Sequence, residues 1–193
     1  MKLAVGILAG GEGKRIGGKK PLRMLGGMSL LDRAIDYASA LPKPFVVAVR
    51  DKGQVGQADI PVIPDDPAID GPIAGLVSAL RFAHDEGAGA VLTIPTDMPF
   101  LPSDLAARLG EALWPNGAAI ACSCDHLHPV CGLWSTGALH SVPQYLASGR
   151  RSLKGFAEAV GYAAVEWPTY PVDPFFNINS QRDLAQAERL LNT

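Results

Sequence analysis

The residues best suited to chemistry follow the first apolar run of the chain, in a loop rich in glycines and cations. The run 3–8 ends at Gly10 and Gly11, which allow the backbone to turn and to approach a ligand closely. The cations of this loop are Lys14, Arg15, Lys19 and Lys20. Exposed amides and cations both attract anions. The loop therefore predicts a polyphosphate site, and the alternative is a basic loop that binds no ligand.

Two familiar phosphate-binding loops fit this stretch incompletely. The segment 13–19 has the spacing of a P-loop, but Lys20 stands where the magnesium-binding Ser or Thr would be. Gly11 and Gly13 match the start of the dinucleotide fingerprint, but Ile16 stands at its third glycine. Neither motif is therefore assigned to this loop.

A carboxylate in the middle of the chain has the position of a metal ligand. Asp97 follows the buried apolar run 91–94 and lies between prolines, which end the strand. The carboxyl ends of strands in α/β proteins face the ligand crevice. Mg²⁺ takes few protein oxygens and completes its shell with water and phosphates. Asp97 can therefore hold magnesium, or it can cap the helix or turn that follows.

Further polar residues lie at the ends of other predicted elements. Asp65 follows a short strand, and Gly71-Pro72 opens a helix whose free amides can face a nucleotide. Arg150 and Arg151 carry guanidiniums suited to phosphate or pterin recognition, or they form an exposed helix end.

Two asparagines precede the last predicted helix. Asn177 and Asn179 lie on one side of an extended segment, so their amides can converge on one ligand. The alternative is helix capping by Asn179 or Ser180.

Four potential zinc ligands also alternate between Cys122 and His128. They lack the two separated pairs of a structural zinc site. Their period of two fits a strand with one buried face, where free cysteine is an ordinary small apolar residue.

Strand-like runs alternate with helical patterns along the chain, which predicts an α/β fold. Strands are expected at 3–8, 45–49, 91–94, 118–122, 129–134 and 163–167. Helices are expected at 30–41, 72–84, 105–113, 137–147, 153–160 and 180–191. Ser29 and Ser103 are the expected N-caps of the helices that follow them.

Composition narrows the class of protein. A length of 193 residues fits one domain, 1–193. A net charge of -2, with cations concentrated at two loops, argues against a nucleic-acid-binding surface. An odd number of cysteines, three, fits reduced thiols. The chain lacks an apolar stretch of transmembrane length, so we expect a cytoplasmic protein without a membrane partner.

The segments Leu8-Ala-Gly-Gly, Arg15-Ile-Gly-Gly and Lys20-Pro-Leu together resemble the signature of small-molecule nucleotidyltransferases. Among these, the molybdenum cofactor guanylyltransferases are the most similar family. The resemblance implies a Rossmann-like three-layer α/β/α sandwich of the nucleotide-diphospho-sugar transferase type, with a mostly parallel sheet. It also implies a reaction in which GMP passes from GTP to the phosphate of the molybdopterin cofactor, with Mg²⁺ present and pyrophosphate leaving.

The resemblance assigns a role to each residue that matches the family pattern. The implied nucleotide contacts are Leu8, Ala9, Gly10, Gly11, Lys20, Asp65 and Asp97. The implied catalytic residues are Arg15, Lys20 and Asp97, and the implied metal ligands are Asp97 and Asn179. The implied contacts to the second substrate are His128, Arg150, Arg151 and Asn177. A molybdoenzyme or a cofactor-delivery protein is the expected macromolecular partner.

The chain departs from the family pattern at two positions. Lys19 replaces the aspartate that usually precedes the lysine of this loop, and the segment 47–50 lacks the family's nucleotide-contacting asparagine. The second departure keeps open a cytidylyltransferase or a sugar-phosphate nucleotidyltransferase of the same fold. The first keeps open a regulator that binds GTP without catalysis.

Overall fold

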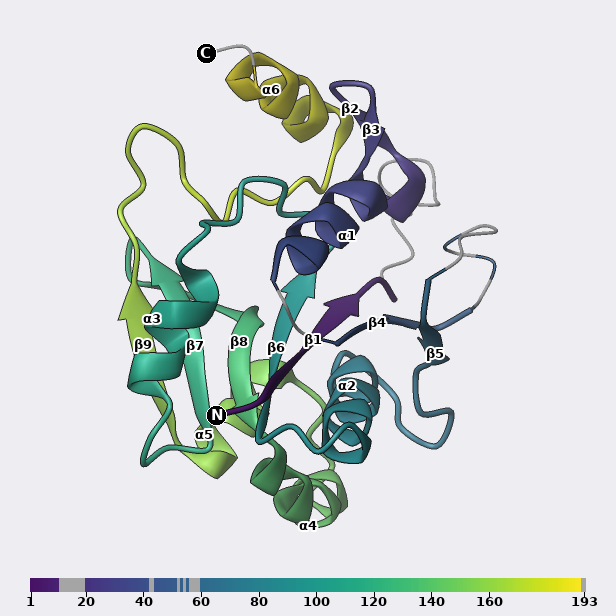
Figure 1. Ribbon diagram of the computed structural model, residues 1–193, viewed down its shortest axis with the longest axis vertical. Helices are drawn as coiled ribbons and strands as arrows, with labels where there is room; N and C mark the ends of the chain where they lie inside the picture. Colours follow the sequence, from purple (N-terminus) through teal and green to yellow (C-terminus); the bar gives the residue numbers. More distant parts are fainter. Residues whose placement is uncertain (11–19, 42–43, 52, 54, 56–59, 192–193) are drawn as a thin grey trace.

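The computed structural model describes residues 1–10, 20–41, 44–51, 53, 55 and 60–191. Its central sheet contains the strands β1 (Leu3–Leu8), β4 (Phe45–Val49), β5 (Val62–Pro64), β6 (Ala90–Pro95), β7 (Ala118–Ser123), β8 (His126–Ser135) and β9 (Tyr162–Glu166). These seven strands lie in the order β5-β4-β1-β6-β8-β7-β9 (Figure 1). The pairs of β8 with β6 and with β7 are antiparallel, and the other pairs are parallel.

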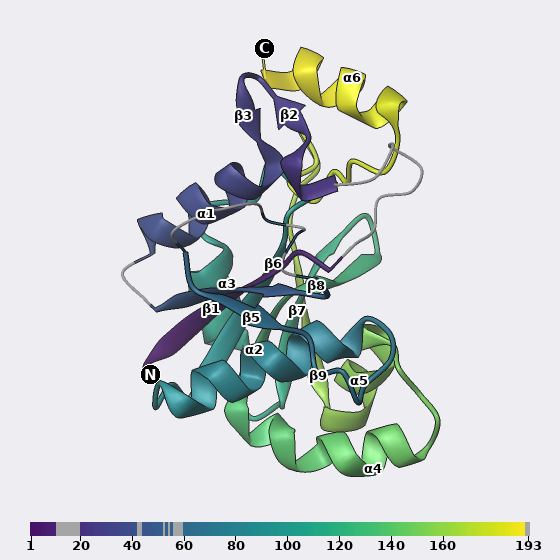
Figure 2. The ribbon, with the colours of Figure 1, turned by 90° about the vertical axis from the view of Figure 1, so that its right-hand side faces the viewer.

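Helices cover both faces of this sheet, so the molecule is a three-layer α/β/α sandwich, as expected. The helices α1 (Leu30–Ala40) and α3 (Leu105–Ala112) pack on one face. The helices α2 (Ile73–Asp85), α4 (Val142–Ala147) and α5 (Leu153–Val160) pack on the other (Figure 2). No helix within the described ranges is long and apolar enough to cross a membrane.

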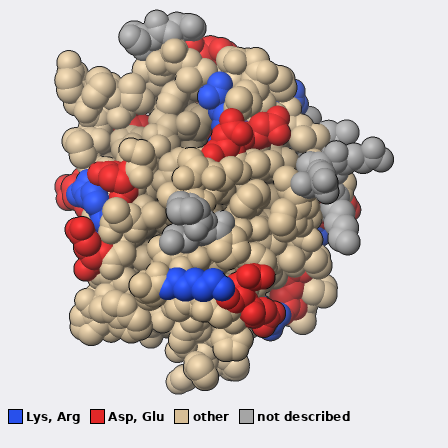
Figure 3. Space-filling model, viewed as in Figure 1, with Lys and Arg blue, Asp and Glu red and all other residues tan. Residues whose placement is uncertain are grey.

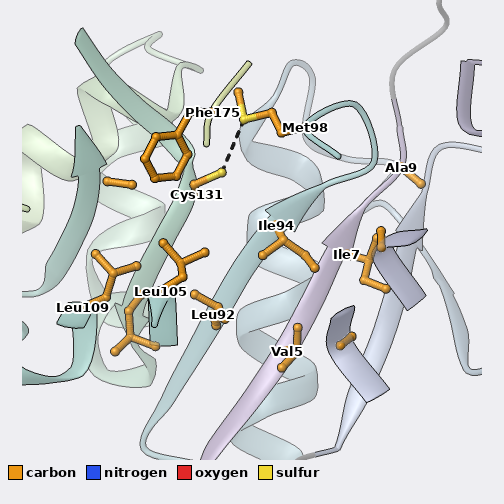
Figure 4. Packing of buried hydrophobic residues seen from close by; sticks show 14 of the residues in the cluster. Val5, Ile7, Ala9, Leu92, Ile94, Met98, Leu105, Leu109, Cys131 and Phe175 are labelled. Atoms are coloured by element: carbon orange, nitrogen blue, oxygen red, sulfur yellow. Dashed lines mark hydrogen bonds between the residues drawn. The ribbon is translucent and has the colours of Figure 1, made fainter. Parts of the chain in front are cut away.

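The core follows the alternation of side chains along the strands. Val5 and Ile7 point toward the layer of α1 and α3, where Leu92 and Ile94 join them (Figure 4). Between them, Gly6 lets α2 approach the opposite face, because a Cβ at Gly6 would lie 2.6 Å from Cβ of Ala79.

Several predicted bounds are confirmed. The strands 3–8 and 45–49 and the helix 153–160 have the predicted limits. Ser29 caps α1, since its Oγ accepts a hydrogen bond from the backbone N–H of Asp32 at 3.0 Å. The predicted helix 137–147 divides into a 3₁₀ helix, Thr136–Ser141, and α4.

Two local predictions were wrong. The N-cap of α3 is Asp104 rather than Ser103, and its Oδ1 accepts from Trp167 Nε1 at 2.9 Å instead of capping the helix. The stretch from Cys122 to His128 is not one strand: it contains the end of β7, a two-residue turn at Cys124 and Asp125, and the start of β8. Cys124 and Asp125 adopt φ values of 47° and 59° there, which end the alternation of a strand.

A second, smaller layer at the top of Figure 1 was not predicted. The hairpin of β2 (Met24–Leu25) and β3 (Met28–Ser29) turns at two glycines with positive φ and lies beside α6 (Gln181–Leu191). Leu25, Leu30, Ile178 and Ala187 are buried between these elements. A Gly-Gly pair between short apolar runs is a hairpin signal that would have located this turn.

Candidate functional site

A cavity of about 300 Å³ opens where β1, β4 and β6 end. Leu8, Ala48 and Pro95 reach it from these three strands. Six residues predicted from the sequence line it: Leu8, Gly10, Lys20, Asp65, Asp97 and Asn177. The carboxyl edge of a parallel sheet is where ligands bind in such folds. The structure therefore brings five of the predicted nucleotide contacts together with Asn177, a predicted contact to the second substrate.

Lys20 makes two short polar contacts beside this cavity. Its Nζ donates to Oδ2 of Asp97 at 2.6 Å and to Oδ1 of Asn179 at 2.7 Å. The side chains of Lys20 and Asp97 are 10% and 20% exposed. The ammonium thus lies between the two side chains expected to hold a metal ion.

Two loops far apart in the chain are held together beneath this contact. The backbone N–H of Ile178 donates to the carbonyl of Asp97 at 2.9 Å. Ile178 itself is fully buried against the hairpin and α6. Ser180 supplies the cap of α6 by accepting from the N–H of Asp183 at 3.2 Å, which leaves the side chain of Asn179 for Lys20.

The oxygens of Asp97 and Asn179 fit a magnesium ion. Both are hard oxygen donors, and a cation, the Lys20 ammonium, already lies within hydrogen-bond distance of both. Among the described residues no group of three or more His, Cys, Asp or Glu side chains forms a metal cage. Mg²⁺ needs no such cage when one or two protein ligands are joined by phosphates and water.

Asp65 follows β5 directly and also lines the cavity. Its carboxylate fits between two glycines: a Cβ at Gly10 would lie 2.9 Å from Oδ2, and a Cβ at Gly75 would lie 3.1 Å from Oδ1. Oδ1 is buried and accepts no hydrogen bond from the part of the chain that the structure describes. Burial raises the pKa of Asp65, and the nearby charge of Arg50 opposes this rise.

Asn177 offers a second unsatisfied acceptor. Its Oδ1 is buried without a hydrogen-bond partner in the described ranges, and the residue lines the cavity. A buried acceptor without a partner costs free energy unless a ligand or water supplies a donor. Asp65 and Asn177 therefore place two acceptors where a ligand with N–H groups can satisfy them.

The other residues predicted to contact the second substrate, His128, Arg150 and Arg151, are not among those that line the cavity. The ring of His128 stacks on Phe175 at 4.8 Å between centroids, and its Nε2 lies 2.9 Å from Oγ of Ser123. Burial lowers the pKa of His128. Val130, two residues along β8, is the one that reaches the cavity from this strand.

The two arginines are engaged elsewhere. Nη2 of Arg150 forms an ion pair with Oε2 of Glu158 at 2.9 Å, and its guanidinium lies 5.2 Å from the ring centroid of Tyr145. Nη1 of Arg151 donates to the carbonyl of Leu146 at 2.8 Å. Its Cβ lies beside Gly71 at the cavity wall, so Arg151 is the nearer of the two.

The rest of the predicted site lies in the segment after β1 and at the end of that strand. Gly11 and Arg15 lie outside the described residues, together with Lys14 and Lys19. Ala9 is buried and its N–H donates to the carbonyl of Ala48 at 2.9 Å, which supports the end of β1. Sequence reasoning missed Val130 and Leu153 in the cavity wall, because apolar residues within regular elements carry no chemical signal.

In the view of Figure 3, Lys and Arg side chains are scattered and several lie directly beside Asp or Glu side chains. Several of the described cations on this face therefore have acidic neighbours, in keeping with the small net charge of the chain.

Known proteins resemble this chain over nearly its full length. Residues 5–161 match the family model of the MobA-like NTP transferase domain. The molybdenum cofactor guanylyltransferase of Bradyrhizobium sp. is 38% identical over 192 residues, which cover 95% of this chain and 91% of that protein. The protein of the same name from Cereibacter sphaeroides is 36% identical over 193 residues, covering 99% and 98%.

Solved structures agree with this assignment. The crystal structure of molybdopterin-guanine dinucleotide biosynthesis protein A from Archaeoglobus fulgidus has a TM-score of 0.79, 27% identity and coverage of 98% of both chains. Family model and relatives together cover the strands, the cavity and the C-terminal segment described above. The chain therefore belongs to the MobA-like NTP transferase family and is a nucleotidyltransferase.

Proposed function

We propose that this nucleotidyltransferase moves GMP from GTP to the terminal phosphate of the molybdopterin cofactor, with Mg²⁺ bound. The names of its relatives support this choice of substrates. The structural observation that carries the proposal is the cluster of Lys20, Asp97 and Asn179, in which a cation meets two oxygen donors and Lys20 and Asp97 line the cavity. Such a cluster suits the phosphates of a nucleotide held beside a magnesium ion.

The nucleotide end of the cavity is assigned to Asp65. A carboxylate only accepts hydrogen bonds, and its buried Oδ1 needs a donor. Guanine carries ring and exocyclic N–H donors next to each other, whereas cytosine offers one exocyclic amine and two acceptors. The cavity wall at Gly10 and Gly75 brings backbone close to this carboxylate and leaves room for a flat base.

In the reaction, an oxygen of the acceptor phosphate forms a bond to the α-phosphorus of GTP. The bond from that phosphorus to the bridging oxygen breaks, and its electron pair leaves with pyrophosphate. The attacking phosphate is already an anion, so the chain needs no general base. Lys20 stabilises the negative charge that develops on the α-phosphate and on the leaving group. Arg15, in the loop before it, is proposed to share this role.

Asp97 and Asn179 are the residues that would hold magnesium. When bound, the ion neutralises phosphate charge and helps to hold the two reacting phosphates together. The hydrogen bond from Ile178 to Asp97 keeps these ligands in register. Phosphoryl-type transfers depend mostly on such positioning and charge neutralisation.

The second substrate is placed at the side of Asn177. Its unsatisfied Oδ1 would accept from the pterin, which carries N–H donors much like those of guanine. Arg151, beside Gly71 at the cavity wall, is the closer candidate for a phosphate contact, and His128 would act from the neighbouring strand.

The test is a transfer assay with purified protein, MgCl₂, molybdopterin cofactor and each nucleoside triphosphate in turn. The expected result is a guanine dinucleotide, identified by mass, together with one pyrophosphate for each dinucleotide. A cytosine dinucleotide would identify the enzyme as a cytidylyltransferase. Binding of GTP without pyrophosphate release under any acceptor would support a regulator instead.

A further inference from the structure

The Lys20 ammonium and the proposed metal ion depend on the same two oxygens. Nζ of Lys20 lies 2.6 Å from Oδ2 of Asp97 and 2.7 Å from Oδ1 of Asn179. These are the oxygens assigned to magnesium above. Lys20 is only 8% exposed, so its ammonium is not a solvated charge that meets them by chance at the surface.

We propose that Lys20 is the resident counter-ion of the metal site, which a divalent cation must displace from Asp97 and Asn179. In this role the lysine holds the two oxygens in place when no substrate is bound. It also weakens the binding of a metal ion in the absence of nucleotide. The inference rests on the metal site in the proposed function and is independent of which nucleotide the enzyme uses.

Competition follows from charge and distance. A magnesium ion held by these two oxygens would need the position that the ammonium now occupies, 2.6 Å and 2.7 Å from them. A second cation brought so close to the ammonium, in a partly buried site, would be strongly repelled. Metal and ammonium are therefore alternative occupants of this pair of oxygens unless further negative charge is present.

A triphosphate supplies that charge. Its oxygens give Lys20 new acceptors, and the long flexible stem of lysine allows the ammonium to move to them. The lysine then leaves Asp97 and Asn179 to the metal. Metal and triphosphate consequently bind with positive coupling, each raising the affinity for the other by the same factor.

The surroundings favour movement of the lysine rather than of its acceptors. Asp97 is fixed through its carbonyl, which accepts from the N–H of Ile178 at 2.9 Å. The N–H of Asn179 donates to Oδ2 of Asp183 at 2.9 Å, at the start of α6. Both oxygens are thus attached to backbone with its own hydrogen bonds, while Lys20 reaches them through its side chain alone.

The experiment measures Mn²⁺ binding to the full chain by electron paramagnetic resonance, without nucleotide or molybdopterin cofactor. Lys20→Met keeps the length and apolar stem of the side chain and removes the ammonium. We expect it to bind Mn²⁺ on the order of tenfold more tightly than the wild type. Lys154→Met, on the exposed face of α5, removes the same charge away from the site and is expected to match the wild type.

Equal or weaker Mn²⁺ binding by Lys20→Met would overturn the proposal, because it would mean that lysine and metal do not share the oxygens. A rise of the same size in Lys154→Met would overturn it too, since net charge would then explain the effect. If Lys20→Met does not fold, as judged by circular dichroism, Lys20→Gln provides the same comparison. Neither result depends on GMP transfer, so failure of the proposed function would be recognised separately in the transfer assay.

Discussion

The backbone N–H of Ile178 donates to the carbonyl of Asp97 across 2.9 Å, joining the segment before α6 to the loop after β6. The two residues are 81 positions apart in the sequence. Asp97 is itself a proposed metal ligand, and Ile178 directly precedes the other one, Asn179. The position of Asp97 relative to Asn179 is therefore determined by the packing of the C-terminal segment, and not by the sheet alone.

Loss of packing at Ile178 should weaken both stability and turnover. Ile178 is fully buried with Leu25, Leu30 and Ala187. Ile178→Ala should lower the free energy of unfolding by about 2–4 kcal/mol, as measured by urea titration. Turnover at saturating substrate should fall as well, because Asn179 loses its support. Ile178→Val, which keeps most of the volume, should cost about 1 kcal/mol and retain most of the activity. A stable Ile178→Ala protein with full turnover would contradict this coupling.

The buried carboxylate of Asp65, proposed to bind the nucleotide, should lower the free energy of unfolding at neutral pH. Burial raises its pKa in the folded state above the ordinary 3.8, so the native protein binds more protons than the unfolded chain between these two values. Stability therefore falls as the pH rises through this window, and the loss is fully present above the folded pKa. Asp65→Asn should raise the melting temperature at pH 7, and the gain should vanish below the ordinary pKa.

The same substitution should weaken binding of GTP, measured by calorimetry, because an amide presents only one acceptor oxygen where the carboxylate presents two. A variant that is more stable at pH 7 and binds GTP as well as the wild type would exclude Asp65 from nucleotide recognition.

Gly75 should be required for the position of Asp65. A Cβ there would lie 3.1 Å from Oδ1 of Asp65 and 3.4 Å from Cδ2 of Leu8. Gly75→Ala should therefore weaken GTP binding severalfold, although alanine favours a helix by about 1 kcal/mol over glycine. Gly110 in α3 is a matched control, because a Cβ there meets no atom within 4 Å. Gly110→Ala should stabilise the protein and leave its affinity for GTP unchanged. If the two variants bind GTP with equal affinity, the predicted effect of a Cβ at Gly75 on Asp65 is contradicted.

Much of the fold was predictable because local signals agreed with the final packing. The strand 3–8 and the cap at Ser29 depend on apolar periodicity and on one short-range hydrogen bond. The predicted cap of α3 at Ser103 was wrong by one residue, and local sequence did not indicate that the Asp104 carboxylate accepts from Trp167, 63 positions away. The turn at Cys124 and Asp125 was not predicted, because the period-two spacing of residue types from Cys122 to His128 resembles a strand although both turn residues have positive φ.

For the site, residue types were visible in the sequence but their contacts were not. Asp97 and Lys20 carry chemical signals in their motifs, whereas their ion pair joins positions 77 apart. The hydrogen bond from Lys20 to Asn179 joins positions 159 apart, and nothing in either segment indicates the other. Arg150 shows the converse: a cation suited to phosphate is satisfied locally by Glu158 and Tyr145.

The most direct test of the central claim compares wild type with Asp97→Ala in magnesium-dependent formation of the guanine dinucleotide from GTP and molybdopterin cofactor, with the product identified by mass. The wild type should form the dinucleotide and release pyrophosphate, whereas Asp97→Ala, folded by circular dichroism, should be slower by at least about a hundredfold. Full turnover by the folded Asp97→Ala protein would contradict the assignment of the reaction to the cluster of Lys20, Asp97 and Asn179.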